Sequence, residues 1–194
     1  MNRREWIARG GTAALGLMAL PWPSPALTTG EGRVLLLRHA LAPGTFDPPG
    51  FEPGDCRTQR NLSAEGRAQA RAIGQWFAQH GPAVTTVRSS PWCRCMDTAR
   101  LAFGRAEAWA DLGSPIELSA TQQQRQIAAL QAALQAVTAQ GGVHVWVTHM
   151  FVQDDLTGQS TAAGEGLMIQ AGGDGRVRVL APWSAAQPAC PSKS

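Results

Sequence analysis

An arginine and a histidine stand side by side at the end of an apolar run near the start of the sequence. Residues 34–37 are typical of a buried strand, and the run stops at Arg38 and His39 with no alternation that would place them on a solvated face. An arginine guanidinium can hold two oxygens of a phosphate or carboxylate at once. An imidazole that neighbouring positive charge keeps unprotonated is a competent nucleophile. The pair therefore indicates a site that binds an oxyanion and attacks it.

Two further apolar runs end in the same abrupt way. The run at 84–88 stops at Ser89 and Ser90, with Arg94 a helical turn further on, and the run GGVHVWVT is followed by His149. Together with the first pair, these residues supply two arginines and two histidines, and no carboxylate is identified among them. That composition suits a cavity for a dianion, and phosphate fits it best. The N-terminus of a helix after Ser90 would add further positive charge.

Helices are expected between the apolar runs. Ser63 is a candidate N-cap for a helix that stops before Gly81. Ser90 is the candidate cap of a second helix over 91–103, with Pro91 at its first helical position. Apolar residues at helical spacing in TQQQRQIAALQAALQAV predict a third helix. Strands and helices thus alternate along the chain.

This alternation predicts an α/β fold: a three-layer α/β/α sandwich with a mostly parallel central sheet. Residues 40–62 are rich in glycine and proline and predict a long surface loop, while EGLMIQAGGDGRVRVLAPW predicts a hairpin. In such sheets, ligands bind beyond the carboxyl ends of the strands. The arginines and histidines singled out above would therefore meet in one binding crevice.

The N-terminus has the three-part layout of an export signal. Arg3 and Arg4 precede a stretch of small residues and leucines at 11–20 that is too short to span a bilayer, and a proline-rich segment follows. The adjacent arginines resemble a twin-arginine address. We expect the twin-arginine export machinery to recognise residues 1–26 and residues 27–194 to form a periplasmic domain without a stable membrane anchor. The alternative is a short anchoring helix retained in the mature protein.

Charge and cysteine usage narrow the function further. The formal net charge of +3 comes from scattered basic residues that form no stripe, so we expect no nucleic-acid partner. Four cysteines in an exported protein allow three disulfide pairings. Cys93 and Cys95 are too close in sequence to bridge easily, so each is expected to pair with Cys56 or Cys190. The Cys-x-Cys spacing does not favour a metal site, and no cofactor is expected.

The ordered motifs resemble those of the histidine phosphatase superfamily. Arg38-His39-Ala40 after an apolar strand, then NLSAEGRAQA, SSPWCRCMDTA and VTH, follow in the order and context of that family. The resemblance implies that His39 forms a phosphohistidine and that Arg38 and Arg94 hold the phosphoryl oxygens. It also implies that His149 donates a further hydrogen bond to them. A cationic cradle of this kind supplies positioning and charge stabilisation, which phosphoryl transfer chiefly needs, so no metal is required.

The acid that protonates the leaving group is the point at which the sequence departs from the family. One branch of the family has a glutamate after the second helix, and another has an aspartate directly after the second histidine, where this chain has Met150. The carboxylates that could replace it are Glu107, Asp111, Glu117, Asp154, Asp155 and Glu165. An activated leaving group would need no acid. The missing acid also motivates an alternative function, a non-catalytic module that binds phosphate or a sugar phosphate.

A narrower similarity concerns small exported histidine phosphatases, among them enzymes proposed to act on lipopolysaccharide core heptose phosphate. It implies a hydrolase for phosphate monoesters, with a phosphorylated small molecule or an envelope sugar phosphate as substrate. It also implies a disulfide that ties the 40–62 loop to the second helix. We expect Arg57, Arg60, Ser89 and Trp92 to contact the substrate, although the two arginines are equally compatible with solvated loop charges.

Overall fold

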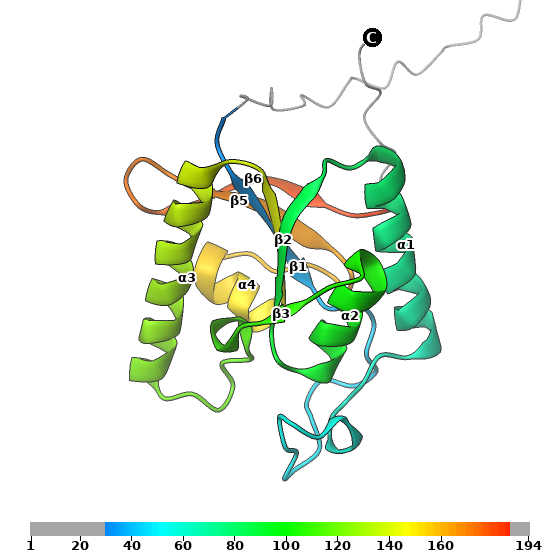
Figure 1. The fold of residues 1–194 in the computed structure, drawn as a ribbon. Coiled ribbons are helices and arrows are strands. Elements are labelled where there is room, and N and C mark those ends of the chain that lie inside the picture. Colours follow the sequence, from blue (N-terminus) through cyan, green and yellow to red (C-terminus); the bar gives the residue numbers. More distant parts are fainter. Residues whose placement is uncertain (1–29, 187–194) are drawn as a thin grey trace, which may run out of the picture.

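A six-stranded sheet forms the centre of the computed structural model, which describes residues 30–186 (Figure 1). The strands are β1 (Arg33–Arg38), β2 (Val84–Ser89), β3 (Glu107–Ala108), β4 (Val143–Thr148), β5 (Gly166–Ala171) and β6 (Val177–Trp183), in the order β3-β2-β4-β1-β5-β6. The first four strands of that order are parallel, and β5 and β6 add an antiparallel hairpin. The predicted mostly parallel sheet is confirmed. The predicted export signal and Cys190 lie outside the described residues.

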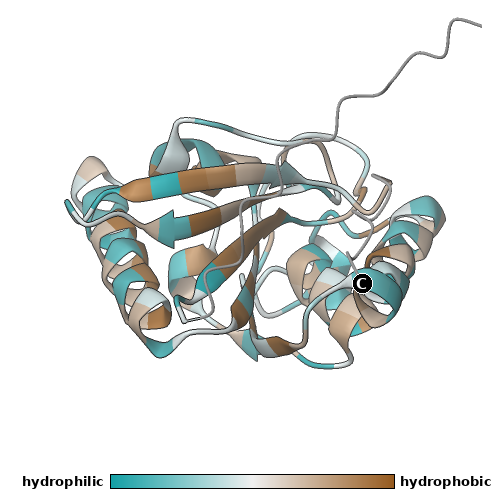
Figure 2. Cartoon of the chain, turned by 90° about the horizontal axis from the view of Figure 1, so that it is seen from above, coloured by the Kyte–Doolittle hydropathy of each residue, from teal (hydrophilic) through white to brown (hydrophobic). Residues whose placement is uncertain are grey.

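Helices cover both faces of this sheet. The helices are α1 (Ala64–His80), α2 (Cys93–Phe103), α3 (Ala120–Gln140) and α4 (Met150–Thr157). α1 and α2 lie against one face and α3 and α4 against the other, which gives the predicted three layers (Figures 1 and 2). None of the helices within residues 30–186 is long and apolar enough to cross a membrane.

The central strand β1 is apolar without alternation because both of its faces are buried. Val34 and Leu36 belong to the core beneath α3 and α4, and Leu35 and Leu37 belong to the core beneath α1 and α2. All four side chains are fully buried. Strands that are covered on both faces are expected to read as continuous apolar runs. The abrupt change at Arg38 therefore marks the point where the chain leaves the core.

The predicted helix signals are mostly confirmed. The Ser63 side chain accepts a hydrogen bond from the backbone N–H of Gly66 and caps α1, which ends at His80. α3 begins with a capping box between Ser119 and Gln122 and extends beyond the predicted stretch at both ends. A capping box satisfies two backbone donors that a helix start leaves without partners. The one residue added at the start of α3, Ala120, follows from that cap.

The predicted start of the second helix was wrong by two residues. α2 begins at Cys93, with Trp92 rather than Ser90 in the N-cap position, and Pro91 lies before the helix. The Ser90 hydroxyl accepts a 3.3 Å hydrogen bond from the Trp92 N–H and also lies 2.9 Å from a ring nitrogen of His149. Ser90 therefore shapes the approach to the helix and contacts the site instead of capping. A short helix that was not predicted, α4, has only two turns and begins directly after His149.

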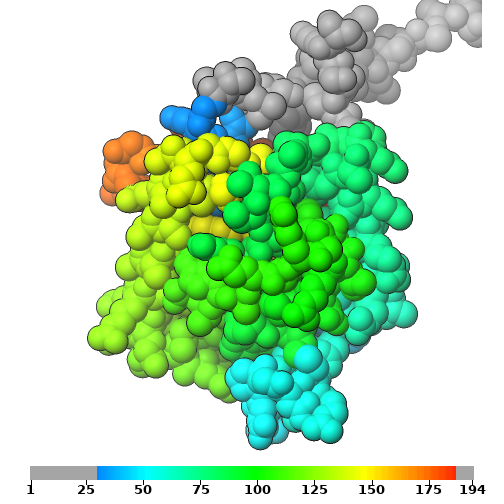
Figure 3. Space-filling model, in the orientation of Figure 1, coloured from blue at the N-terminus to red at the C-terminus, as the bar shows by residue number. Residues whose placement is uncertain are grey.

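The long loop between β1 and α1 projects from the end of the molecule at which the parallel strands finish (Figures 1 and 3). A disulfide between Cys56 and Cys93 ties this loop to the first residue of α2. That is the bridge implied by the similarity to the exported phosphatases. Cys95 is buried and carries a free thiol, so the expectation that it also forms a disulfide was wrong. The loop is thereby fixed over the strand ends and can contribute side chains there.

Candidate active site

The two histidines of the predicted site lie side by side because neighbouring parallel strands carry them. Arg38 pairs with Thr148 in the register of β1 and β4, and the backbone N–H of His39 donates a 2.9 Å hydrogen bond to the Thr148 carbonyl. The next residue of each strand is a histidine, and the centroids of the His39 and His149 rings are 5.6 Å apart. The prediction that they converge is confirmed by this geometry.

Five arginine and histidine side chains line one cavity of about 330 Å3. They are Arg38, His39, Arg60, Arg94 and His149. The cavity, called the cationic cavity below, lies where the carboxyl ends of β1, β2 and β4 meet the long loop. This is the place where open α/β sheets bind their ligands. The structure therefore brings together all four residues predicted to be catalytic.

The His39 ring is held in a form that leaves one nitrogen free to attack. Its Nδ1 lies 2.8 Å from the Ala40 carbonyl oxygen. Because a carbonyl oxygen can only accept, Nδ1 donates and carries the proton, so Nε2 of the neutral ring has a free lone pair. Burial lowers the pKa of His39 to about 3, and the charges of Arg94, Arg60 and Arg38 act in the same direction. At neutral pH the ring is an unprotonated nucleophile.

His149 is neutral as well, and both of its nitrogens have partners. Nη2 of Arg94 lies 3.3 Å from Nδ1, and the Ser90 hydroxyl lies 2.9 Å from Nε2. A guanidinium can only donate, so Nδ1 accepts and Nε2 donates to Ser90. Burial holds the pKa of His149 well below its usual value, and the charge of Arg94 lowers it further. In this arrangement His149 orients Arg94. To donate the predicted hydrogen bond to a phosphoryl oxygen, Nε2 of His149 would have to release the Ser90 hydroxyl.

Backbone carbonyls hold Arg38 and Arg60 through Nη1, and the Nε atom of each arginine in the cavity has no partner within residues 30–186. Arg38 donates from Nη1 to the Thr161 carbonyl, and Arg60 donates from Nη1 to the Gly44 carbonyl. The Nε atoms of Arg38, Arg60 and Arg94 are buried without a hydrogen-bond partner within residues 30–186. Burial lowers the pKa of Arg60, and the nearby charge of Arg94 adds to the effect. Close like charges favour the binding of an anion.

One carboxylate enters the cationic cavity, and the sequence analysis missed it. Asp47 accepts hydrogen bonds from Nη1 of Arg94 at 2.8 Å, from Nε1 of Trp92 at 3.1 Å and from the backbone N–H of Arg60 at 2.9 Å. Burial would raise the pKa of Asp47, but the hydrogen bond from Arg60 and the charge of Arg94 outweigh it and lower the pKa. Asp47 therefore stays ionised and fixes Arg94. It lies in an aperiodic loop, where only the length of the loop hinted at a function.

The residues predicted to contact substrate separate into two groups. Arg60 lines the cationic cavity, and Trp92 lines the cavity next to it. Arg57 lies outside both cavities: its side chain is 90% exposed and pairs with Asp55 at 2.6 Å. Ser89 is fully buried, lines neither cavity and donates its hydroxyl to the carbonyl of the next residue.

The carboxylates considered as proton donors do not line the cationic cavity. These are Glu107, Asp111, Glu117, Asp154, Asp155 and Glu165. Glu107 pairs with Arg88 at 3.5 Å, and Glu165 accepts a hydrogen bond from the backbone N–H of Ala162. Glu117 lines the neighbouring cavity. Within residues 30–186, no group of three or more His, Cys, Asp or Glu side chains could hold a metal ion.

Comparison with known proteins finds one family model that matches part of the chain. Residues 34–119 match the family model of the histidine phosphatase superfamily, branch 1. The matched stretch contains β1, the long loop, α1, β2 and α2, and with them His39 and Arg94. The chain has the histidine phosphatase fold. No curated protein matches the chain.

Solved structures with a similar fold include enzymes of more than one kind. The protein histidine phosphatase SixA, complexed with tungstate, is 16% identical, with a TM-score of 0.56 over 79% of this chain and 97% of that one. A mycobacterial glucosyl-3-phosphoglycerate phosphatase, complexed with VO3, is 16% identical, with a TM-score of 0.56 over 80% and 100%. A phosphoglycerate mutase from Thermus thermophilus is 19% identical, with a TM-score of 0.50 over 78% and 98%. These similarities show the fold alone, so the reaction must be argued from the site.

Proposed function

We propose that the protein is a phosphatase that hydrolyses phosphate monoesters through a phosphohistidine on His39. The observation that carries this proposal is the tautomer of His39, whose Nδ1 donates to the Ala40 carbonyl and leaves Nε2 free. This nitrogen belongs to a buried neutral ring in a cavity that three arginines also line. The two similar phosphatases described above were each solved with an oxyanion, tungstate or VO3, which supports a phosphate in this place.

The reaction takes two displacements at phosphorus. In the first, Nε2 of His39 forms a bond to phosphorus while the bond to the leaving oxygen breaks, and that oxygen takes the electron pair and a proton from solvent or an acid. In the second, water attacks the phosphohistidine, the P–N bond breaks, and phosphate leaves as His39 returns to its neutral form. Arg38, Arg60 and Arg94 balance the charge of the phosphoryl oxygens throughout.

We further propose that the enzyme is exported by the twin-arginine machinery and acts in the periplasm on sugar phosphates of the cell envelope. The layout of residues 1–26 and the similarity to exported phosphatases support this proposal. A disulfide is also expected of a protein that works in an oxidising compartment. Cell fractionation of the full chain tests export: replacing Arg3 and Arg4 by lysine should leave the protein in the cytoplasm. Unchanged location of that variant would contradict twin-arginine export.

A second candidate function is a module that binds phosphate or a sugar phosphate without turnover. The observation that favours it is the absence of the carboxylates considered as acids from the cationic cavity, within residues 30–186. The carboxylate that does reach the cavity, Asp47, is held by Arg94 and has a lowered pKa, so it is a poor proton donor.

Rapid quench with a phosphorus-labelled aryl phosphate separates the two functions, because an aryl leaving group needs little help from an acid. We expect an acid-labile phosphoenzyme in the wild type and none in His39→Ala. Phosphate binding without any label on His39 would establish the binding module instead. Arg94→Ala should weaken phosphate binding about 100-fold, as expected for the loss of a buried charge-assisted contact. Arg100→Ala is the matched control, since Arg100 lies exposed on the same helix.

A further inference from the structure

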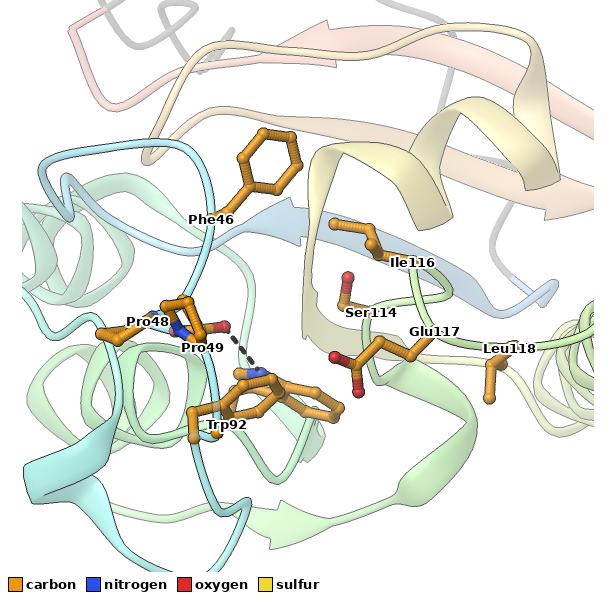
Figure 4. A pocket seen from close by; sticks show the side chains of 11 residues that line it. Phe46, Pro48, Pro49, Trp92, Ser114, Ile116, Glu117 and Leu118 are labelled. Atoms are coloured by element: carbon orange, nitrogen blue, oxygen red, sulfur yellow. Dashed lines mark hydrogen bonds between the residues drawn. The ribbon is translucent and has the colours of Figure 1, made fainter.

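A second cavity lies beside the cationic cavity, and its walls are mostly apolar (Figure 4). It has a volume of about 220 Å3. One wall comes from the long loop and the other from the segment that precedes α3, while Trp92 forms the floor between them. Its apolar lining residues include Phe46, Pro48, Phe51, Trp92, Ile116 and Leu118. The cavity is called the apolar cavity below.

The two cavities adjoin each other. Phe46, Asp47, Ser114 and Ile116 line both of them. A phosphate held by the arginines of the cationic cavity would therefore direct its ester substituent toward the apolar walls. The apolar cavity therefore lies within reach of the leaving group of a phosphate monoester bound in the cationic cavity.

The most exposed large apolar side chains flank this junction. Within residues 30–186, the large apolar side chains that remain exposed are Phe46, at 65%, and Ile116, at 50%. They approach the cavity from opposite sides in Figure 4. Apolar side chains that gather at the rim of a cavity mark a binding site, because a ligand removes them from water.

Trp92 offers a ring face that is already fixed before a ligand binds. Its Nε1 donates to Asp47 at 3.1 Å, and the centroid of its ring lies 6.0 Å from that of Phe51. An aromatic face of this kind packs against flat apolar surfaces of a ligand, and a ring that is held in place loses little entropy on binding.

Two carboxylates line the apolar cavity and limit what can occupy it: Asp47, which pairs with Arg94, and Glu117. The Glu117 carboxylate points into it from the segment before α3, near the hydroxyl of Ser114 (Figure 4). Arg38 and Arg60 line the cationic cavity but not this one. A second anionic group on the leaving group would therefore meet a carboxylate without a matching cation, which is unfavourable in a partly enclosed site.

We propose that the apolar cavity binds the leaving group of the substrate and that this group is an uncharged ring with an apolar face. The proposal rests on the proposed phosphatase function, because it takes the cationic cavity as the phosphate site. Both an aromatic ring and the C–H face of a sugar ring have this chemistry, and substrates that carry a second phosphate or a carboxylate do not.

Affinities for phosphonates test the cavity independently of turnover, because their C–P bond is not hydrolysed in this reaction. By calorimetry we expect benzylphosphonate to bind about tenfold more tightly than methylphosphonate, from burial of part of the ring. 4-Carboxybenzylphosphonate should lose most of that gain, and Glu117→Gln should restore it. Equal affinities for methylphosphonate and benzylphosphonate would overturn the proposal. Absence of methylphosphonate binding would overturn the phosphate site as well.

Variants on the two walls test whether the ring of benzylphosphonate binds in the apolar cavity. Phe51→Ala and Leu118→Ala, from opposite walls, should each lower the ratio of benzylphosphonate to methylphosphonate affinity by about threefold, as expected from the apolar contact area removed. Glu52→Ala is the control on the same loop, because its side chain is exposed and lines neither cavity. A ratio unchanged in both wall variants would place the ring elsewhere and overturn the proposal.

Turnover then distinguishes the two proposals from each other. Ethyl, benzyl and glucose 6-phosphate all release a primary alcohol, so their kcat/KM values differ mainly through binding of the leaving group. A preference for either ring over ethyl phosphate supports the subsite, and comparison of the two rings tells a sugar from an aromatic group. Equal kcat/KM values for all three would refute the subsite and leave the phosphatase intact. Absence of any turnover, with the phosphonate preference present, would refute the phosphatase alone.

Discussion

Replacing Asp47 with asparagine removes one charge from a buried ion pair and leaves the shape of the side chain almost unchanged. Asp47 and Arg94 are separated by 2.8 Å, and their side chains are 8% and 4% exposed. The same carboxylate accepts hydrogen bonds from Trp92 and from the backbone of Arg60. It thus joins the long loop to α2, and asparagine would offer one acceptor oxygen where two are used.

The expected loss can be estimated from the burial of the pair. Removing one partner of a buried ion pair leaves the other charge uncompensated and costs about 3 to 5 kcal/mol. Asparagine keeps part of the hydrogen bonding, so we expect a loss of about 3 kcal/mol in the free energy of unfolding. For a chain of this size, that corresponds to a decrease in Tm on the order of 10 °C.

Calorimetry or urea unfolding at pH 7 measures this loss, and Asp55→Asn is a matched control. Asp55 lies on the same loop and pairs with Arg57 at 2.6 Å, but the Arg57 side chain is 90% exposed. Water screens such a pair, so the control should change stability far less. If Asp47→Asn destabilises the protein no more than Asp55→Asn, the carboxylate does not anchor Arg94 in the way described.

Three further predictions concern stability. As pH falls below 6.5, the free energy of unfolding should decrease by about 1.4 kcal/mol per pH unit through His39, because the unfolded chain takes up a proton on this ring and the folded protein does so only near pH 3. Equal stability by urea titration at pH 7 and pH 5 would contradict this. Reducing the disulfide, whose cysteines are 37 residues apart, should lower the free energy of unfolding by about 4 kcal/mol, measured as a lower urea midpoint with reductant. An unchanged midpoint would contradict this stabilisation. Gly66→Ala should lower the free energy of unfolding by about 1 to 3 kcal/mol in thermal unfolding, because a Cβ there lies 2.0 Å from the Leu41 carbonyl oxygen. In the control Gly54→Ala, the added Cβ meets no atom within 4 Å, so stability should change little. Similar losses in the two variants would refute the argument.

Much of the site could be predicted because its residues lie at the ends of regular elements. The apolar run of β1 stops at Arg38, and in a parallel sheet every such stop lies at the same edge. That geometric rule was enough to bring His39, Arg94 and His149 together before any coordinates were considered. The rule places only those residues that stand next to a strand or helix whose limits can be recognised from the spacing of its apolar residues.

Residues on the long loop could not be placed in that way. Asp47 and Arg60 reach the cavity, whereas Arg57 does not, although all three lie on the same aperiodic segment. Asp47 is directed by its pair with Arg94 of α2, Arg60 by the carbonyl of Gly44, and Arg57 by its pair with Asp55. The disulfide was implied by the similarity to exported phosphatases, but no sequence pattern indicated the pair between Asp47 and Arg94, because its partners are far apart along the chain.

The sequence by itself determined the order of the longer strands and helices, though not β3 or α4, together with the two-sided burial of β1 and the identity of the residues at the strand ends. These features depend on apolar spacing and on turn and cap residues. The tertiary structure alone decided which nitrogen of His39 is free, that a carboxylate holds Arg94, and that an apolar cavity adjoins the cationic one. Each of these depends on where a carbonyl, a carboxylate or a ring from another segment comes to lie. Such positions are set only when the layers and the long loop pack together.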